Sequence, residues 1–234
     1  MKQMKKPSRL VVGLSGASGI IYGIRLLQIL RDMPDVESHL IVSSAAKRTL
    51  EYETDWKLRD VVALADYSYP FRDVGAAPAS GSFRTLGMVV LPCSMRTLSG
   101  VALSSDENLL IRAAGVALKE RRRLVLVPRE TPMHLGHLRL MVQAAEIGAI
   151  IAPPVPAFYM RPESVSDLVD HTVHRILDIF DLEPPYDIAR WPPDGPPPAL
   201  AVPDPSPDDD YLDGPARPGS YEFRTRAQPS FADM

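Results

Sequence analysis

The residues best suited to chemistry stand directly behind runs of aliphatic residues. The segment Pro128-Arg129-Glu130-Thr131-Pro132 follows the run Leu124–Val127 and sets a cation beside a carboxylate between two prolines. An arginine can bind a phosphate through two parallel hydrogen bonds, and an adjacent carboxylate can transfer a proton. A plain surface turn is the alternative, but its place after a predicted strand favours a site.

A second segment of this kind is Ser94-Met95-Arg96-Thr97, which comes after Met88–Leu91 and Pro92-Cys93. Two hydroxyls flanking a cation at a predicted helix start fit a phosphate or the polar edge of a flavin. The lone thiol of Cys93 is more typical of a buried structural cysteine than of a nucleophile, because no catalytic triad can be read around it.

Small residues follow the first aliphatic run. The loop Gly13–Gly19 contains Gly16, Ala17 and Ser18 and leads into a helix, so its backbone can approach an anion closely. It matches neither a Walker loop nor a dinucleotide fingerprint. Ser43 follows the second run, where a dinucleotide enzyme carries an acid, which favours a mononucleotide; this serine is equally suited to cap the next helix.

Further candidates lie on helices and in a second small-residue loop. Arg112 and Lys119 are seven residues apart, which places both on one helix face, either as an anion site or in surface ion pairs. Arg121–Arg123 crowd the end of that helix, where the helix dipole alone favours positive charge. The loop Ala79–Phe83 can admit a second anion. The cluster Glu51–Asp55 is more typical of a solvated face.

Metal binding is not expected. The pairs His134/His137 and His171/His174 have a spacing that allows two ligands each, but no clear third ligand stands near either pair.

The elements that must position these residues alternate along the chain. Short aliphatic blocks predict buried parallel strands, and the amphipathic stretches between them predict helices. The strands are expected at Leu10–Leu14, Leu40–Val42, Met88–Leu91, Leu124–Val127 and Ala149–Ala152; the main helices are expected at Ile20–Met33, Asn108–Arg122, His137–Ile147 and Val165–Phe180. This order predicts a doubly wound three-layer α/β/α fold, Rossmann-like or flavodoxin-like, with a mainly parallel sheet and its site beyond the carboxyl ends of the strands.

Composition divides the chain of 234 residues into two parts. Residues 1–191 form one α/β domain by size, with the folded unit from about Ser8 to Trp191. Residues 192–234 hold 11 of the 24 prolines and eight acidic residues against three arginines, so a disordered or extended tail is predicted there.

Charge and cysteine content exclude several classes of protein. The net charge of −3 argues against a general nucleic-acid binder, and the single cysteine indicates a reducing, cytoplasmic compartment. The apolar run Leu10–Leu14 is too short for a secretory signal, and no stretch approaches the length of a membrane span.

Taken in order, these segments resemble the UbiX/Pad1 family of flavin prenyltransferases over about Leu10 to Trp191. The resemblance rests on seven motifs in sequence order: Gly16-Ala17-Ser18-Gly19, Glu53-Thr54-Asp55, Ala79-Ser80-Gly81-Ser82, Pro92-Cys93-Ser94, Leu118-Lys119-Glu120-Arg121-Arg122, Pro128-Arg129-Glu130 and Ala157-Phe158-Tyr159.

The resemblance implies a metal-free transfer of a dimethylallyl group from dimethylallyl phosphate to N5 and C6 of reduced FMN. The prenylated FMN then serves UbiD-type decarboxylases, as in ubiquinone biosynthesis. It also implies a homo-oligomer, typically a dodecamer, with sites at subunit junctions.

The site residues that the resemblance implies fall into three groups. FMN is expected to contact Gly16, Ala17, Ser18, Ser43, Ser94, Met95, Arg96, Thr97, Arg112 and Arg129. The prenyl donor is expected to contact Ser80, Gly81, Lys119, Arg129, Glu130, Tyr159, Arg175 and Trp191. The catalytic groups are expected to be Glu130, Ser18, Glu53 and Lys119.

Two other functions stay open. One is a flavin-dependent cysteine decarboxylase of related fold, although the first predicted helix lacks the histidine such enzymes carry nearby and the loop reads Ser-Gly-Ser. The other is a non-catalytic FMN carrier subunit, for which Lys119, Glu130 and Arg175 together have no evident use. The sequence leaves open the choice of allyl phosphate or diphosphate.

Overall fold

Strands and helices alternate along the computed structural model, which describes residues 7–185. The strands are β1 (Ser8–Leu14), β2 (Val36–Val42), β3 (Tyr67–Tyr69), β4 (Gly87–Cys93), β5 (Arg123–Pro128) and β6 (Ala149–Ile151). The helices are α1 (Ile20–Arg31), α2 (Ser44–Glu53), α3 (Leu58–Val62), α4 (Met95–Ala102), α5 (Leu109–Lys119), α6 (Leu135–Glu146) and α7 (Val165–Ile179), with short 3₁₀ turns η1 (Ala77–Ala79) and η2 (Phe158–Met160).

The six strands form one sheet in the order β3-β2-β1-β4-β5-β6, and every neighbouring pair is parallel. Side chains alternate between the two faces with the period of two that a strand imposes. On β1, Leu10, Val12 and Leu14 belong to one hydrophobic cluster, whereas Val11 belongs to the other. Both faces are therefore covered, which explains why the strands read as solid aliphatic runs.

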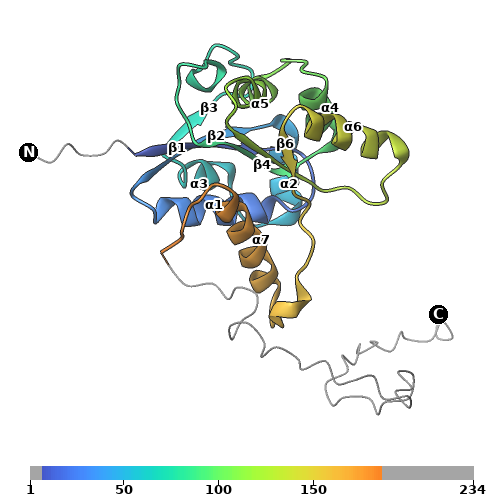
Figure 1. The fold of residues 1–234 in the computed structure, drawn as a ribbon. Helices are drawn as coiled ribbons and strands as arrows, with labels where there is room; N and C mark the ends of the chain where they lie inside the picture. The colour runs from blue at the N-terminus through green and yellow to red at the C-terminus, as the bar shows by residue number, and fades with distance from the viewer. Residues whose placement is uncertain (1–6, 186–234) are drawn as a thin grey trace, which may run out of the picture. The chain divides into compact units, whose positions relative to one another are not determined.

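Helices cover the two faces as separate layers (Figure 1). Helices α1, α2, α3 and α7 pack on the first cluster, and α4, α5 and α6 pack on the second. Helix α1 lies so close to β4 that a Cβ on Gly23 would collide with the carbonyl oxygen of Leu91. The three-layer α/β/α fold with a parallel sheet is confirmed.

The order of the strands reverses between β1 and β4, since the chain first winds outward to β3 and then returns to the centre. In a doubly wound sheet the loops at such a reversal diverge onto opposite faces and leave a crevice at the carboxyl edge. The loops after β1 and β4 therefore define where a ligand is expected.

Three local features differ from the sequence prediction. Strand β3 was not expected: Tyr67-Ser68-Tyr69 is a short, largely exposed edge strand without an aliphatic run. Strand β6 ends at Ile151, so Ala152 lies outside it. The apolar spacing within Ile20–Met33 predicts Ile21 on the buried face of the helix, but 38% of its surface is exposed, and Ile20 lies in the core instead.

The predicted tail from residue 192 lies outside the described residues, so its state stays a prediction. Of the helices within residues 7–185, none combines the length and the apolar character that crossing a membrane requires.

Candidate active site

The loops that follow β1 and β4 are joined through one buried serine. The hydroxyl of Ser15 donates to the carbonyl oxygen of Pro92 at 2.9 Å and accepts from the amide of Ser94 at 2.7 Å. The amide of Ser15 also donates to Pro92. Ser15 thereby fixes the relative positions of the predicted anion-binding loop Gly16–Ser18 and the start of α4.

Helices α2 and α4 both begin beside this junction, and each is capped by its own serine. The Ser43 hydroxyl accepts from the amide of Ala46 at 3.1 Å, and the Ser94 hydroxyl accepts from the amide of Thr97 at 3.3 Å. Ser94 also donates to the Thr97 hydroxyl at 3.1 Å. Such caps satisfy helix amides that would otherwise lack partners. The capping role of Ser43, one of its two interpretations, is confirmed.

The loop before α1 is shaped by contact as well as by conformation. A Cβ on Gly16 would collide with Ala45 at the start of α2, and Gly19 adopts φ 98°, which glycine tolerates best. The carboxylate of Glu53 accepts from the amides of Gly19 at 2.9 Å and Ile20 at 3.1 Å. Glu53 therefore has a structural role, because its carboxylate places a negative charge at the positive end of α1.

Arg129 and Glu130 stand at the same edge. The Arg129 amide donates to the carbonyl oxygen of Cys93 at 3.2 Å, which brings this loop against the start of α4. Arg129 is exposed, as is Arg96 in the first turn of α4, and Glu130 is half-buried, with its carboxylate accepting from the Thr131 amide at 3.1 Å.

Ser80, Gly81 and Lys119 gather at the opposite, amino edge of the sheet. Lys119 ends α5 and forms an ion pair with Glu120 at 2.6 Å; the ends of the two side chains lie over Gly81, where a Cβ would displace them. This ion pair lowers the pKa of the Glu120 carboxyl below its usual value. The Ser80 hydroxyl lies 2.8 Å from that of Ser82.

The residues at the carboxyl edge and those at the amino edge are separated by the length of the sheet's strands. Lys119 comes just before β5 begins at Arg123, and Arg129 comes just after β5 ends at Pro128. At a rise of about 3.3 Å per residue, the strand alone spans about 16 Å. Arg112 lies on the first turns of α5, away from Lys119, and forms an ion pair with Asp106 at 2.8 Å.

The remaining candidates occupy the layer of α7. The Tyr159 hydroxyl lies 3.1 Å from Nε2 of His171, and Arg175 forms an exposed ion pair with Asp178 at 2.7 Å. Trp191 lies outside the described residues. One chain therefore brings the predicted FMN contacts in the loops after β1, β2, β4 and β5 to one edge of the sheet, but it distributes the predicted donor contacts over three places.

Cys93 is fully buried in β4 against the second hydrophobic cluster. Burial strongly raises the pKa of its thiol above the usual value, so the thiolate needed for attack is disfavoured. Within residues 7–185, no group of three or more His, Cys, Asp or Glu side chains is arranged to hold a metal ion.

Sequence reasoning missed two residues that organise these places. Ser15 was read only as part of a small-residue loop, and Arg122 only as a partner of the helix dipole. Arg122 in fact donates to the carbonyl oxygens of Gly81 and Phe83. Its partners are backbone atoms some forty positions earlier, and no local pattern in the sequence carries that information.

Comparison with known proteins assigns the chain. The flavoprotein family matches residues 1–177, and the fold and the paired loops at the strand reversal agree with that class. The chain is 62% identical over 184 residues to the flavin prenyltransferase UbiX of Escherichia coli K12, which covers 78% of this chain and 97% of that protein. The chain belongs to the UbiX family of flavin prenyltransferases.

Two solved structures agree with this assignment. One, from Escherichia coli O157:H7, is described as a dodecameric FMN-dependent UbiX-like decarboxylase; it is 52% identical, has a TM-score of 0.76, and covers 78% of this chain and 98% of its own. The other is AnUbiX (PadA1) in complex with FMN and dimethylallyl pyrophosphate; it is 49% identical, has a TM-score of 0.75, and covers 76% and 94%.

The residues at the carboxyl edge fit a flavin mononucleotide. Three helices begin there, and two of them, α2 and α4, carry a capping hydroxyl from Ser43 and Ser94. At α1 the Glu53 carboxylate already takes the first amides, whereas the start of α4 has Arg96 and Arg129 nearby. A phosphate is therefore better suited to α4 than to α1.

We expect Ser15→Ala to destabilise the protein by about 1–3 kcal/mol, because it leaves the buried Pro92 carbonyl and Ser94 amide without their partner. FMN should bind more weakly, because the start of α4 loses its link to the loop before α1. Urea unfolding and flavin-fluorescence titration measure both effects. Ser99→Ala, on helix α4, is the control. Equal results for the two variants would contradict this role of Ser15.

Proposed function

We propose that the chain transfers a dimethylallyl group from dimethylallyl phosphate to N5 and C6 of reduced FMN without a metal ion. The observation that carries the proposal is the hydrogen bond from the Arg129 amide to the Cys93 carbonyl oxygen, which sets Arg129 and Glu130 beside the start of α4, where we expect the flavin to bind. A phosphate-binding cation and a proton-transferring acid thereby border one crevice.

The flavin side of the site lies within one chain. Gly16, Ala17 and Ser18 line it after β1, and Ser43 and the turn Ser94–Thr97 close it after β2 and β4. We assign the FMN phosphate to the turn of α4 together with Arg129. Glu53 and Ser18 then face the reacting side of the ring, where the Glu53 charge also holds α1 in place.

The donor side must combine residues from different copies of the chain. Lys119, Ser80 and Gly81 lie at the amino edge, whereas Arg129 and Glu130 lie at the carboxyl edge, so one chain cannot place them around a single small phosphate. A symmetric oligomer can bring the amino edge of one copy to the carboxyl edge of another. The dodecameric assembly described for the relative from Escherichia coli O157:H7 supports this arrangement.

In the assembled oligomer, these residues can stabilise the charges that develop during the reaction and accept the released proton. Breaking the allylic C–O bond leaves charge on the departing phosphate, which the fixed cations Lys119, Arg129 and Arg175 stabilise. The aromatic face of Trp191 is suited to the positive charge that develops on the allyl group. Glu130 is placed to accept the proton lost as the flavin ring regains aromaticity, a task the phosphate itself can share.

Helix α6 carries the surface that we assign to assembly. Its outward stripe is apolar: Leu135 is 59% exposed, Leu138 45% and Val142 56%, and Ile147 and Ile150 continue the patch to edge strand β6. Its opposite face already packs on the core through Met141 and Ala144. A helix with two apolar faces is typical of a buried interface between subunits.

The product and its use follow from the family. We propose that the prenylated FMN is passed to a UbiD-type decarboxylase in the cytoplasm. A reducing compartment of this kind keeps a free thiol such as that of Cys93 reduced. The cysteine decarboxylase alternative is not favoured, because the chain shares 62% identity with a curated flavin prenyltransferase. The FMN carrier is the alternative that the following assay separates.

The assay incubates the full chain with reduced FMN and dimethylallyl monophosphate without added metal, and the flavin is then weighed by mass spectrometry. We expect the mass of one prenyl unit to be added. Binding of FMN with no change of mass would instead support the carrier. Dimethylallyl diphosphate in a parallel sample determines the preferred donor.

We expect Glu130→Gln to retain FMN affinity within about twofold and to slow turnover at least about tenfold, because the amide cannot accept the proton. Steady-state rates and FMN titration measure the two effects. Glu107→Gln, in an exposed loop, is the matched control. Unaltered turnover in Glu130→Gln would remove this residue from the mechanism.

We expect Leu138→Glu to break the oligomer into smaller species and to reduce prenyl transfer more than about tenfold, because it places a charge in an apolar contact. Size-exclusion chromatography with light scattering gives the mass of the assembly. Leu138→Met keeps the apolar character and should behave as the wild type. A full-sized Leu138→Glu oligomer rules out α6 as the interface.

A further inference from the structure

The loop Ser80–Phe83 is held at the amino edge by one arginine. The guanidinium of Arg122 donates to the carbonyl oxygen of Gly81 at 2.6 Å and to that of Phe83 at 2.7 Å. Only 15% of the Arg122 side chain is exposed, in contrast to 47% for its neighbour Arg123. Charge-assisted hydrogen bonds from a partly buried, planar group fix geometry more strongly than exposed contacts do.

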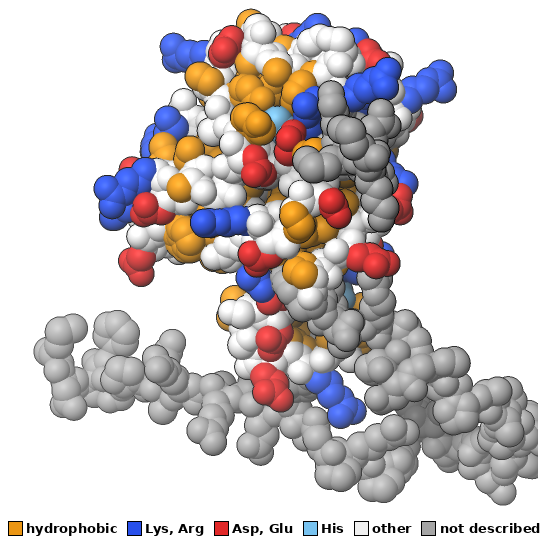
Figure 2. All heavy atoms as spheres, turned by 90° about the vertical axis from the view of Figure 1, so that its left-hand side faces the viewer, with side chains coloured by type: hydrophobic (Ala, Val, Ile, Leu, Met, Phe, Trp, Pro, Cys, Tyr) orange, Lys and Arg blue, Asp and Glu red, His pale blue; other side chains and the backbone are white. Residues whose placement is uncertain are grey.

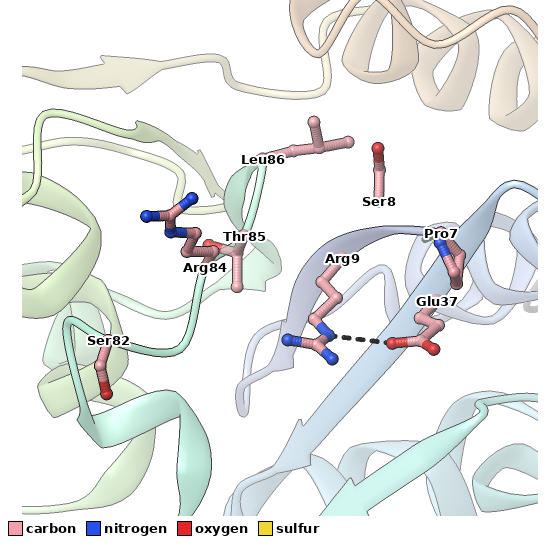
Figure 3. Close-up of a pocket in the computed structure, with 8 residues that line it drawn as sticks. All are labelled: Pro7, Ser8, Arg9, Glu37, Ser82, Arg84, Thr85 and Leu86. Atoms are coloured by element: carbon pink, nitrogen blue, oxygen red, sulfur yellow. Dashed lines mark hydrogen bonds and ion pairs between the residues drawn. The ribbon is translucent and has the colours of Figure 1, made fainter. Parts of the chain in front are cut away.

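The opposite side of this loop is anchored by the ring of Phe83. The Arg9 guanidinium lies 4.7 Å from the centre of that ring, and the buried ring of His39 meets it edge-on at 4.9 Å. Arg9 is itself held by Glu37 at 2.9 Å, an interaction drawn in Figure 3. The side chain of Phe83 and its carbonyl oxygen are thus fixed from different directions.

Beyond Phe83 the chain borders an open hollow until it meets β1 at Leu86. A cavity of about 650 Å³ separates residues 82–86 from the start of β1, with Ser82, Arg84 and Thr85 on one side and Pro7 and Arg9 on the other (Figure 3). Figure 2 faces this amino edge, where charged side chains of both signs surround apolar patches. The loop is therefore held at the Leu86 end by β1, whose Arg9 carbonyl oxygen accepts from the Leu86 amide at 2.7 Å, whereas the carbonyl oxygens of Gly81 and Phe83 are held by Arg122.

The carbonyl oxygen of Gly81 that Arg122 holds belongs to the residue beside Lys119. Gly81 sits directly beneath the Lys119–Glu120 ion pair, so that a Cβ there would displace these two side-chain ends. Glu120 also approaches Arg122, at 4.0 Å. The loop backbone at Gly81 and the ends of the Lys119 and Glu120 side chains therefore lie side by side at the amino edge.

We propose that Arg122 is the positioning residue of the prenyl-donor site: it holds the loop Ser80–Ser82 in register with Lys119, so that one copy presents both to the phosphate of the donor bound at another. This inference rests on the proposed function and deepens it. Arg122 is not a catalytic residue, since its guanidinium is directed at backbone carbonyls of its own chain.

The two hydrogen bonds depend on the shape of the arginine side chain and not only on its positive charge. An arginine reaches both carbonyl oxygens through its two terminal nitrogens, whereas a lysine ammonium is a compact point charge on a flexible stem. Arg122→Lys should therefore keep the charge but only part of the geometry, and Arg122→Gln should lose both. Arg123→Gln removes a charge at the adjacent position, whose partner Asp181 lies away from the loop, and is the matched control.

The experiment compares these three variants with the full-length wild-type oligomer in steady-state kinetics. For Arg122→Gln we expect the KM for dimethylallyl monophosphate to rise at least about tenfold, kcat to fall less than about threefold, and FMN affinity to stay within about twofold. Arg122→Lys should give an intermediate KM, and Arg123→Gln a KM near the wild-type value. An unchanged KM in Arg122→Gln, an equal rise in Arg123→Gln, or loss of the oligomer would overturn the proposal.

Hydrogen–deuterium exchange of the same samples provides a readout that does not require turnover. We expect faster exchange in peptides covering residues 80–86 of both Arg122 variants, and wild-type exchange in Arg123→Gln. Unchanged exchange in the Arg122 variants shows that this residue does not hold the loop. If the wild type transfers no prenyl group, the proposed function fails, and the exchange arm still decides whether Arg122 fixes the loop.

Discussion

A parallel sheet imposes the constraint on which the rest of this structure depends. Every residue that precedes a strand lies at one edge, and every residue that follows a strand lies at the other. Lys119 precedes β5 and Arg129 follows it, so the two cations expected to bind the donor phosphate lie on opposite sides of a core of side chains. The proposed active site therefore needs more than one copy of the chain, and the apolar stripe on α6 fits that requirement.

The two edges are built in different ways. At the carboxyl edge, Ser15 ties the loops of β1 and β4 together, and Ser43, Ser94 and Glu53 satisfy the first amides of three helices. These polar groups are oriented by the fold, so ligand binding there needs little rearrangement. At the amino edge, a loop is fixed by Arg122 and Phe83 beside an open cavity.

Much of the fold could be predicted because its signals are local. Aliphatic runs predicted five of the six strands, and each corresponds to a buried or partly buried strand in the structure. Strand β3 was missed, since Tyr67-Ser68-Tyr69 joins the sheet only as an exposed edge. The sequence also indicated the loops that meet at the strand reversal. It could not indicate the partners of Ser15 or Arg122, which lie 77 and about 40 positions away.

Complementation between inactive chains tests the shared site most directly. Lys119→Ala and Arg129→Ala chains, each inactive alone, are co-expressed with different tags, and mixed oligomers are isolated and assayed for prenylated FMN. If each site takes the two side chains from different, randomly assembled copies, roughly a quarter of the sites regain both and activity returns. Mixed oligomers as inactive as either parent would show that the two residues do not meet across subunits.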